Sequence, residues 1–324
     1  MSNRKTIVIG SRGSKLALIQ ANWVKAQLEA HNREIEFNIE KIKTTGDKIT
    51  DVPLARIGGM GLFTKELENA LLDEKVDLIV HSAKDIPTEI PEGLILGAFS
   101  KREDPHDVLI SKDNLTLNKL PQNARIGTSS LRRRSQILSF RSDLEVVDLR
   151  GNLDTRLKKI DSGELDAIVV ARAGLLRFGL FDKASEIIQY DIMLPAVGQG
   201  ALCIEIRGND ADVKEIISIL NHQETMYAVK TERVLLAELQ GGCQIPIGAH
   251  AEIVLPDKLE LEAVVCSLDG KTVVRDSISG NVDDFADIGH KLAQRLLSMG
   301  GAKILEEIRT SLDKTTLENP FNKS

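Results

Sequence analysis

Arginine is concentrated in one stretch of this 324-residue chain, and that stretch is where chemistry is first expected. Nine of the 19 Arg lie between residues 125 and 177. With Lys158 and Lys159 the stretch has eleven cations against seven acids, although the whole chain carries a formal net charge of −6. Guanidinium groups bind carboxylates and phosphates through two parallel hydrogen bonds. The distribution therefore predicts a local anion site in an acidic protein.

Two segments place small hydroxyl residues and arginine between a strand-like run and a helix. Residues 10–14 read Gly-Ser-Arg-Gly-Ser, and residues 127–134 read Gly-Thr-Ser-Ser-Leu-Arg-Arg-Arg. Backbone N–H groups at a helix N-terminus attract anions. In the first segment a plain capping turn needs the same residues, so both interpretations stay open. In the second, three cations oppose the helix dipole, which favours an anionic ligand over a solvated charge run.

A third basic segment, residues 149–156, carries Arg150 at a strand end and Arg156 on the next helix. Ligands of open α/β sheets bind beyond the carboxyl ends of the strands, where both guanidinium groups are expected. The alternative is ordinary surface pairing with Asp148 and Asp154.

A polar cluster, residues 81–87 (His-Ser-Ala-Lys-Asp-Ile-Pro), directly follows a buried-strand run. Asp85 suits a general acid or the stabilisation of a cation, and Lys84 suits an anion. The alternative is that Asp85 and Pro87 only form a turn. His81 by itself is expected to be structural.

The three cysteines differ in their surroundings. Cys203 and Cys266 lie in apolar, strand-like runs and are predicted core residues. Cys243 lies in a loop flanked by Gly and Pro, where it can be a nucleophile, a covalent cofactor anchor or a chance loop residue. No Cys-x-x-Cys pair is present, so we expect no disulfide framework and no metal site.

Composition excludes several classes of protein. An acidic net charge and 3% aromatic residues argue against general nucleic-acid binding, although the run Arg132-Arg133-Arg134 keeps that hypothesis testable. No stretch has the roughly 18 apolar residues of a membrane span, and the N-terminus lacks a signal core. We therefore expect a cytoplasmic protein with no membrane partner.

Strand and helix signals alternate over the first three-fifths of the chain, which predicts α/β layers with mostly parallel strands. A helix is expected with Leu16, Ile19, Trp23 and Leu28 on one face. A polar, turn-rich segment from 102 to 121 separates two such halves. Asp77 to Val80 and Asp166 to Val169 occupy similar places in them. After residue 222 a long helix, a hairpin at Asp269-Gly270 and two amphipathic helices predict a smaller α+β domain.

Taken together, the motifs resemble the porphobilinogen deaminase family, also called hydroxymethylbilane synthases. The matching blocks run in the family's order across nearly the whole chain; they are residues 10–18, 61–66, 81–85, 102–105, 126–133, 149–156, 194–201 and 241–248. Any single block is weak evidence, whereas the ordered set is highly specific.

The resemblance implies a reaction, a cofactor and a fold. Four porphobilinogen molecules are joined head to tail with loss of ammonia, and water releases the linear product. A dipyrromethane cofactor, held by a thioether to Cys243, primes the chain. Two doubly wound domains like periplasmic binding proteins surround a cleft, with a smaller α+β domain beside them. The implied domains are 1–101 with 196–220, then 102–195, then 221–324, and the implied state is a monomer.

The resemblance also implies the roles of individual residues. Asp85 is the catalytic carboxylate and stabilises the cation left when ammonia departs. Residues implied to bind the cofactor are Cys243, Ser82, Lys84, Thr128, Ser129, Arg132 and Arg133. Residues implied to bind the carboxylates of the substrate or the growing chain are Arg12, Ser14, Arg150, Arg156 and Arg177.

Three positions depart from the family's pattern. Met60, in the lid-like loop 54–61, stands where Lys is common, and Thr45 stands where a basic residue is frequent. Arg172 adds an unusual cation. We expect these departures to affect turnover and affinity. A different class of function, a non-catalytic two-domain anion sensor, needs neither Cys243 nor Asp85 and would bind its ligand without releasing ammonia.

Overall fold

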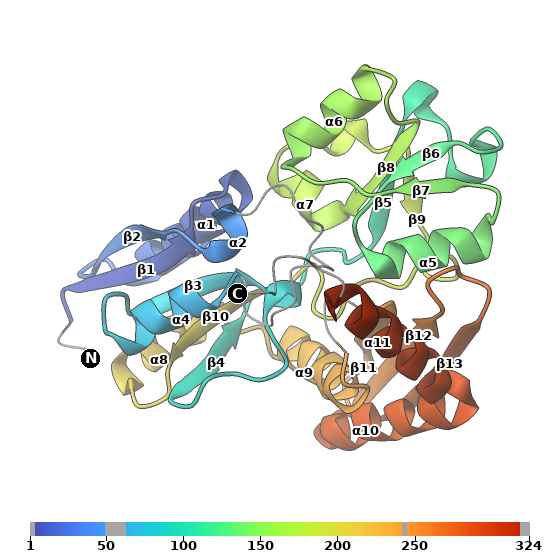
Figure 1. The fold of residues 1–324 in the computed structure, drawn as a ribbon. Helices are drawn as coiled ribbons and strands as arrows, with labels where there is room; N and C mark the ends of the chain where they lie inside the picture. Colours follow the sequence, from blue (N-terminus) through green and yellow to red (C-terminus); the bar gives the residue numbers. More distant parts are fainter. Residues whose placement is uncertain (1–3, 49–62, 242–244, 318–324) are drawn as a thin grey trace.

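The computed structural model describes residues 4–48, 63–241 and 245–317. They form two α/β units, each built on a five-stranded sheet, and a smaller unit with a three-stranded antiparallel sheet (Figure 1). The predicted fold class is therefore confirmed. Within the described residues, no helix is both long and apolar enough to cross a bilayer.

The first unit has the strand order β2-β1-β3-β10-β4. Its strands are β1 (Thr6–Arg12), β2 (Glu36–Ile42), β3 (Leu78–Ser82), β4 (Leu94–Phe99) and β10 (Leu202–Arg207). Its helices are α1 (Lys15–His31), α2 (Thr45–Lys48), α4 (Lys65–Leu72), η1 (Ala83–Asp85), α8 (Ala211–Ile217) and η5 (Ser218–Leu220). β10 runs antiparallel to both of its neighbours.

The second unit repeats this order as β7-β6-β8-β5-β9. Its strands are β5 (Asp107–Ser111), β6 (Arg125–Gly127), β7 (Glu145–Val147), β8 (Ala167–Ala171) and β9 (Glu186–Ile188). Its helices are α5 (Leu131–Phe140), α6 (Leu153–Asp161), α7 (Arg172–Arg177), η2 (Lys112–Asn114), η3 (Leu117–Lys119) and η4 (Phe181–Lys183). Here β5 is the antiparallel strand.

The prediction of a turn-rich segment over 102–121 was wrong for residues 107–111, which form the buried strand β5. The run Val108-Leu109-Ile110 carried the signal, because a short apolar run bounded by turn residues is typical of a buried strand. Of the apolar face expected on α1, Leu28 is buried but Trp23 is not. Trp23 is 44% exposed, and the buried stripe is formed by Gln20, Ala21, Val24 and Leu28.

The third unit contains β11 (Ile247–Leu255), β12 (Lys258–Cys266) and β13 (Val273–Asn281) in sequential antiparallel order. Its helices are α9 (Gln223–Glu238), η6 (Val282–Asp284), α10 (Phe285–Leu296), a π-helical turn η7 (Leu297–Gly301) and α11 (Ala302–Leu317). The hairpin at Asp269-Gly270 and the two closing helices are confirmed. Cys203 and Cys266 are buried free thiols, as predicted.

Helix α9 joins the third unit to the other two, and Figure 1 shows it between β4 and β11. Its wholly buried Glu232 accepts bonds from Arg102 Nη1 at 2.6 Å and Nη2 at 3.2 Å. The same carboxylate accepts from the backbone N–H groups of Gly198 and Ala251, at 2.6 and 2.7 Å. Arg102 lies in the segment between β4 and β5, and Gly198 lies in the segment between β9 and β10. Both segments that connect the sheet units are therefore hydrogen-bonded to α9.

Candidate active site

The two motifs with small hydroxyl residues are built alike. β1 and β6 each lead into a short turn and then a helix, α1 or α5. Ser14 caps α1 by accepting from Ala17 N at 3.3 Å, and Ser130 caps α5 by accepting from Arg133 N at 3.4 Å. The capping function expected of such turns is therefore present in both units.

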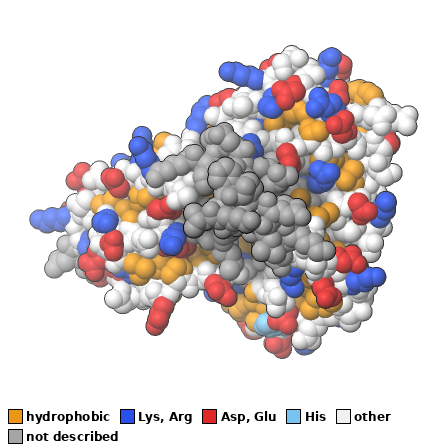
Figure 2. Space-filling model, viewed as in Figure 1, with side chains coloured by type: hydrophobic (Ala, Val, Ile, Leu, Met, Phe, Trp, Pro, Cys, Tyr) orange, Lys and Arg blue, Asp and Glu red, His pale blue; other side chains and the backbone are white. Residues whose placement is uncertain are grey.

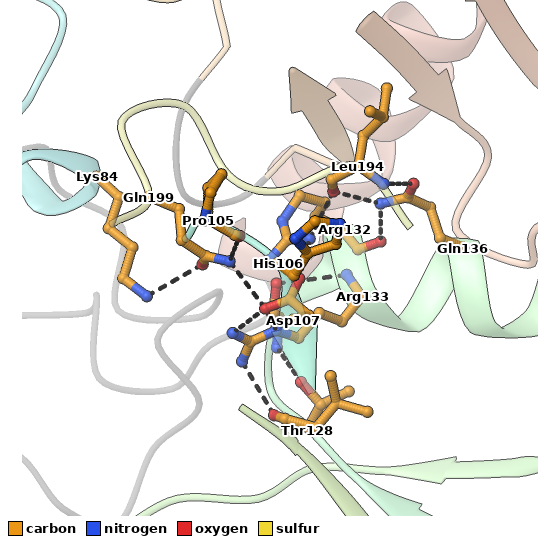
Figure 3. Close-up of polar contacts among 12 residues, drawn as sticks. Lys84, Pro105, His106, Asp107, Thr128, Arg132, Arg133, Gln136, Leu194 and Gln199 are labelled. Carbon is orange, nitrogen blue, oxygen red and sulfur yellow. Dashed lines mark hydrogen bonds and ion pairs between the residues drawn. The ribbon is translucent and has the colours of Figure 1, made fainter. Parts of the chain in front are cut away.

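A buried carboxylate, Asp107, organises the basic motif of the second unit (Figure 3). It is the first residue of β5 and is 0% exposed. Arg132 Nη1 donates to one carboxylate oxygen at 2.7 Å, while Arg133 donates to the other from Nε at 3.1 Å and from Nη2 at 2.7 Å. Burial alone would raise the pKa of Asp107, but the two guanidinium groups outweigh it and hold that pKa well below its usual range. The cations at the start of α5 thus have an internal counter-ion.

From the sequence, these arginines were interpreted either as a site for an anionic ligand or as a solvated charge run. Their internal partner, Asp107, was not predicted. Further bonds fix both side chains: Arg132 Nη1 donates to Leu194 O at 2.7 Å, and Arg133 Nη1 donates to Val169 O at 3.1 Å. One carboxylate for two guanidinium groups still leaves an excess of positive charge.

Lys84 of the first unit approaches this cluster through Gln199 (Figure 3). Lys84 Nζ donates to Gln199 Oε1 at 3.3 Å, and Gln199 Nε2 donates to Asp107 at 3.0 Å and to Pro105 O at 2.7 Å. Burial, and then the like charge of Arg133, lower the pKa of Lys84 to about 8. Lys84, Gln199, Asp107, Arg132 and Arg133 are named the Asp107 cluster below. Gln199 was not predicted as a site residue, although it lies in residues 194–201, one of the blocks that carry the family resemblance.

Two further predicted arginines are half-buried and anchored by backbone carbonyls. Arg156 Nε donates to Gly151 O at 2.9 Å, and burial followed by the charge of Arg133 lowers the pKa of Arg156 to about 10. Arg177 Nη2 donates to Gly200 O at 2.9 Å, and burial lowers its pKa also. Asp154, weighed as a surface partner for the arginines, lies 3.6 Å from Lys15 of the first unit. Arg150 is half-buried beyond the end of β7.

The predicted hydroxyl residues have backbone or scaffold partners. Ser129 Oγ donates to Leu149 O at 2.7 Å and accepts from Leu149 N at 3.0 Å, which ties the two basic loops together. Thr128 Oγ1 accepts from Ser130 N at 3.2 Å. Ser82 Oγ contacts the side-chain amide of Gln20, at 2.8 Å from its nitrogen. These side chains position the loops around the Asp107 cluster.

Asp85 differs from Asp107 in being exposed at the end of the short helix η1. Arg12, the last residue of the neighbouring strand β1, stacks over the Phe63 ring, with 4.1 Å from its guanidinium carbon to the ring centre. The structure therefore combines one exposed carboxylate with several cations that burial holds away from bulk water. On the face drawn in Figure 2, acidic and basic side chains are interspersed, and no broad basic surface is visible.

Comparison with known proteins identifies the family. Residues 7–215 match the model of the porphobilinogen deaminase dipyrromethane cofactor binding domain, and residues 226–298 match that of the porphobilinogen deaminase C-terminal domain. The chain belongs to the porphobilinogen deaminase family. A porphobilinogen deaminase from Desulforamulus reducens is 51% identical over 303 residues, which cover 94% of this chain and 98% of the relative. One from Carboxydothermus hydrogenoformans is 51% identical over 306 residues, with the same coverage.

Solved substrate-binding proteins also match this member of the porphobilinogen deaminase family. A putative methionine-binding lipoprotein from Bacillus subtilis is 15% identical, with a TM-score of 0.41, and the match covers 68% of this chain and 92% of that one.

Two of the three positions predicted to depart from the family's pattern have local partners. Thr45 donates to Glu66 from its backbone N at 2.8 Å and from its hydroxyl at 2.5 Å. Arg172 Nη1 donates to Asp104 at 2.5 Å. Met60 and the predicted anchor Cys243 lie outside the described residues.

Proposed function

We propose that this chain is a hydroxymethylbilane synthase, a transferase that condenses four porphobilinogen molecules head to tail and releases the linear tetrapyrrole by hydrolysis. The observation that carries the proposal is the match to both family domain models, which together span most of the chain. The Asp107 cluster supports it, because each pyrrole unit brings two carboxylates that need cations.

The residues around the Asp107 cluster fit a polycarboxylate cofactor. Burial, together with the positive charge of Arg133, lowers the pKa values of Lys84, Arg132 and Arg156, so a bound carboxylate relieves repulsion as well as forming hydrogen bonds. The dipyrromethane group, once bound, supplies the pyrrole carbon to which the first substrate is joined. We assign its thioether anchor to Cys243. Ser82, Thr128 and Ser129 hold the surrounding loops.

The substrate's carboxylates are assigned to the remaining cations. These are Arg12, Arg150, Arg156 and Arg177, with Ser14, and they come from both sheet units. Arginine is suited to this task because its planar fork binds carboxylate through two hydrogen bonds. Each condensation adds two negative charges, so a set of several arginines is needed to hold successive units.

Asp85 is assigned to the bond-breaking step. The carbon–nitrogen bond of the substrate's aminomethyl group breaks, ammonia leaves with the electron pair, and a cation remains on the pyrrole side. The Asp85 carboxylate stabilises that cation and can move a proton to or from the amine. An exposed carboxylate beside the buried cations of the Asp107 cluster suits this role.

Intact-mass spectrometry of the purified protein tests the proposal. We expect a mass above the sequence mass by one dipyrromethane group, a positive Ehrlich reaction, and one ammonia released per porphobilinogen consumed. Cys243→Ser is the matched control and should carry no added mass. A cofactor-loaded preparation with nothing attached to Cys243, or a protein that binds porphobilinogen without releasing ammonia, would contradict the proposal.

The proposal also covers the division of the chain into domains, the location of the protein in the cell and its oligomeric state. We assign domain 1 to residues 1–101 with 196–220, domain 2 to 102–195 and domain 3 to 221–324. We propose that the enzyme acts as a cytoplasmic monomer with no nucleic-acid or membrane partner. Size-exclusion chromatography with light scattering tests the monomer: a mass near 35.6 kDa is expected.

A further inference from the structure

The segment that carries Lys84 and Asp85 rests on helix α9 of the third unit. Ala83 and Ile86, which flank these two residues, are 2% and 6% exposed. They belong to one apolar cluster with Val229 of α9, and Met226 of α9 packs against that cluster. The apolar residues on either side of Lys84 and Asp85 therefore pack against α9, while Asp85 itself is exposed to solvent.

Arg233 extends this support along the same face of α9, four residues after Val229. Its Nη1 donates to Ile86 O at 3.3 Å, and its Nη2 donates to Pro87 O at 2.6 Å and to Thr88 O at 3.2 Å. One guanidinium group therefore holds three successive carbonyls directly after Asp85.

The planar fork of arginine is what makes this grip possible. A carbonyl triplet needs donors spread over several ångströms, which a guanidinium offers and a single ammonium does not. Glu205 is an acidic group close enough to act electrostatically on Arg233. Burial lowers the pKa of Arg233, but a guanidinium group is not deprotonated in proteins and therefore stays charged.

We propose that Arg233 is a positioning residue for the reaction: it fixes the segment 86–88 and thereby the placement of the Asp85 carboxylate. The inference rests on the proposed function, since it needs Asp85 to act on the substrate. A misplacement of about 1 Å in a catalytic group can cost on the order of 100-fold in rate. Arg233 touches neither substrate nor cofactor in this assignment and acts only through the backbone.

The test compares Arg233→Gln and Arg233→Lys with the wild-type holoenzyme. We expect Arg233→Gln to carry the cofactor mass and to lose about 10- to 100-fold in kcat, with KM for porphobilinogen within about twofold. Arg233→Lys should lose about threefold or more, because one ammonium cannot span three carbonyls. The split between kcat and KM distinguishes positioning from a general loss of substrate binding.

Arg141→Gln is the matched control. Arg141 also holds three carbonyls, those of Leu117, Asn118 and Leu120, but it lies in the second unit away from Asp85. This control should keep wild-type kcat. The inference is overturned if Arg233→Gln stays within twofold of wild-type kcat, if its loss appears in KM, or if Arg141→Gln loses as much.

Two further outcomes separate this inference from the proposed function. If Arg233→Gln does not fold, Arg233→Lys decides, and wild-type kcat in the lysine variant overturns the inference. If the wild-type holoenzyme releases no ammonia from porphobilinogen, the proposed function fails and this inference fails with it. An active wild type with equally active variants rejects the positioning role alone.

Discussion

The two sheet units share a strand order but differ at one equivalent position. In the first unit, Leu202 opens the antiparallel strand β10 and lies opposite Ser82, the last residue of β3. In the second unit, Asp107 opens β5 and lies opposite Ala171, the last residue of β8. The same place in the scaffold therefore holds a leucine in one unit and the carboxylate that gathers two arginines in the other.

The first unit also has a buried acid on its antiparallel strand, but at a different depth. Glu205 lies three residues farther along β10 and pairs with His81, whose Nε2 is 3.0 Å away. Both side chains are almost wholly buried. An acid at the strand end shapes the site, whereas an acid inside the sheet serves the scaffold. Asp107 and Glu205 are both buried acids, so the difference between a site role and a scaffold role lies in where along the strand each one is placed.

A feature common to both units shows that the scaffold itself is repeated. Asp77 accepts from Val8 N at 2.8 Å, and Asp166 accepts from Arg125 N at 2.7 Å. Each aspartate lies just before the strand that follows, and its own N–H bonds back to the same partner residue. The weak repeat seen in the sequence at these positions therefore corresponds to a shared local structure.

The largest expected effect comes from removing the acid at the strand end. Asp107→Asn leaves two buried guanidinium groups without a counter-ion and should lower the free energy of unfolding by about 3–5 kcal/mol. Glu205→Gln leaves a histidine that can be neutral, so about 1–3 kcal/mol is expected. Chemical denaturation of both variants measures the difference, and equal losses would remove the distinction between the two acids.

The difference in free energy of unfolding between wild type and Asp107→Asn should depend on pH in a defined direction. The folded-state pKa of Asp107 is depressed, so its stabilisation is present above the unfolded-state pKa and is lost as the pH falls through the folded-state pKa. The gap between wild type and Asp107→Asn should therefore shrink below about pH 4. A gap that persists unchanged at pH 2–3 would contradict this.

The exposed carboxylate of the first unit should affect rate and not stability. Asp85→Asn removes the charge assigned to the developing cation and should lower kcat by about 100- to 1,000-fold. Since Asp85 is exposed, the thermal midpoint should stay close to that of wild type. Steady-state assays with porphobilinogen and a thermal scan test both statements; wild-type turnover would reject the assignment.

Lys84, assigned above to the cofactor's carboxylates, links the two units and should have a smaller effect, on the kcat/KM of the cofactor-loaded enzyme. It loses its proton above a pKa of about 8, and bound carboxylates can only raise that value. We expect kcat/KM to fall about tenfold through a pKa at or above 8, and Lys84→Met to be low and flat at all pH values. A declining limb that persists in Lys84→Met would assign it to another group.

The smallest effect is expected at the exposed contact between the units. Lys15 lies 3.6 Å from Asp154 and 5.3 Å from the centre of the Phe178 ring, and both charged groups are more than half exposed. Lys15→Ala should change the free energy of unfolding by less than about 1 kcal/mol, and added salt should reduce the difference. A larger change would mean that this exposed contact, and not the buried contacts between the two sheet units, holds the units together.

Local patterns allowed most of the fold to be predicted. The hairpin at Asp269-Gly270 and the repeated segments that begin at Asp77 and Asp166 were predicted, because turn residues and apolar runs mark them in the sequence. The buried face of α1 was missed, since its stripe includes the polar Gln20 while the apolar Trp23 is exposed. Periodicity counts apolar residues and cannot weigh which neighbours surround them.

The candidate site was predicted in its cations but not in what organises them. Arg132 and Arg133 stand out by composition, whereas Asp107 and Gln199 are single polar residues distant in sequence. Their importance arises from strand β5 and the junction at residues 198–200, which bring them to α5 only in the folded chain. Arg233 was missed for the same reason, because carbonyl partners leave no trace in a sequence.

The crossing of the chain between the sheet units has a consequence for synthesis on the ribosome. In the first sheet, β3 and β4 are separated by β10, which is not made until residue 207. The second sheet draws all its strands from residues 107–188. During synthesis, β3 and β4 of the first unit therefore each lack a partner strand until the whole second unit has been made. A nascent chain halted before β10 should protect the second sheet from proteolysis and leave the first one open.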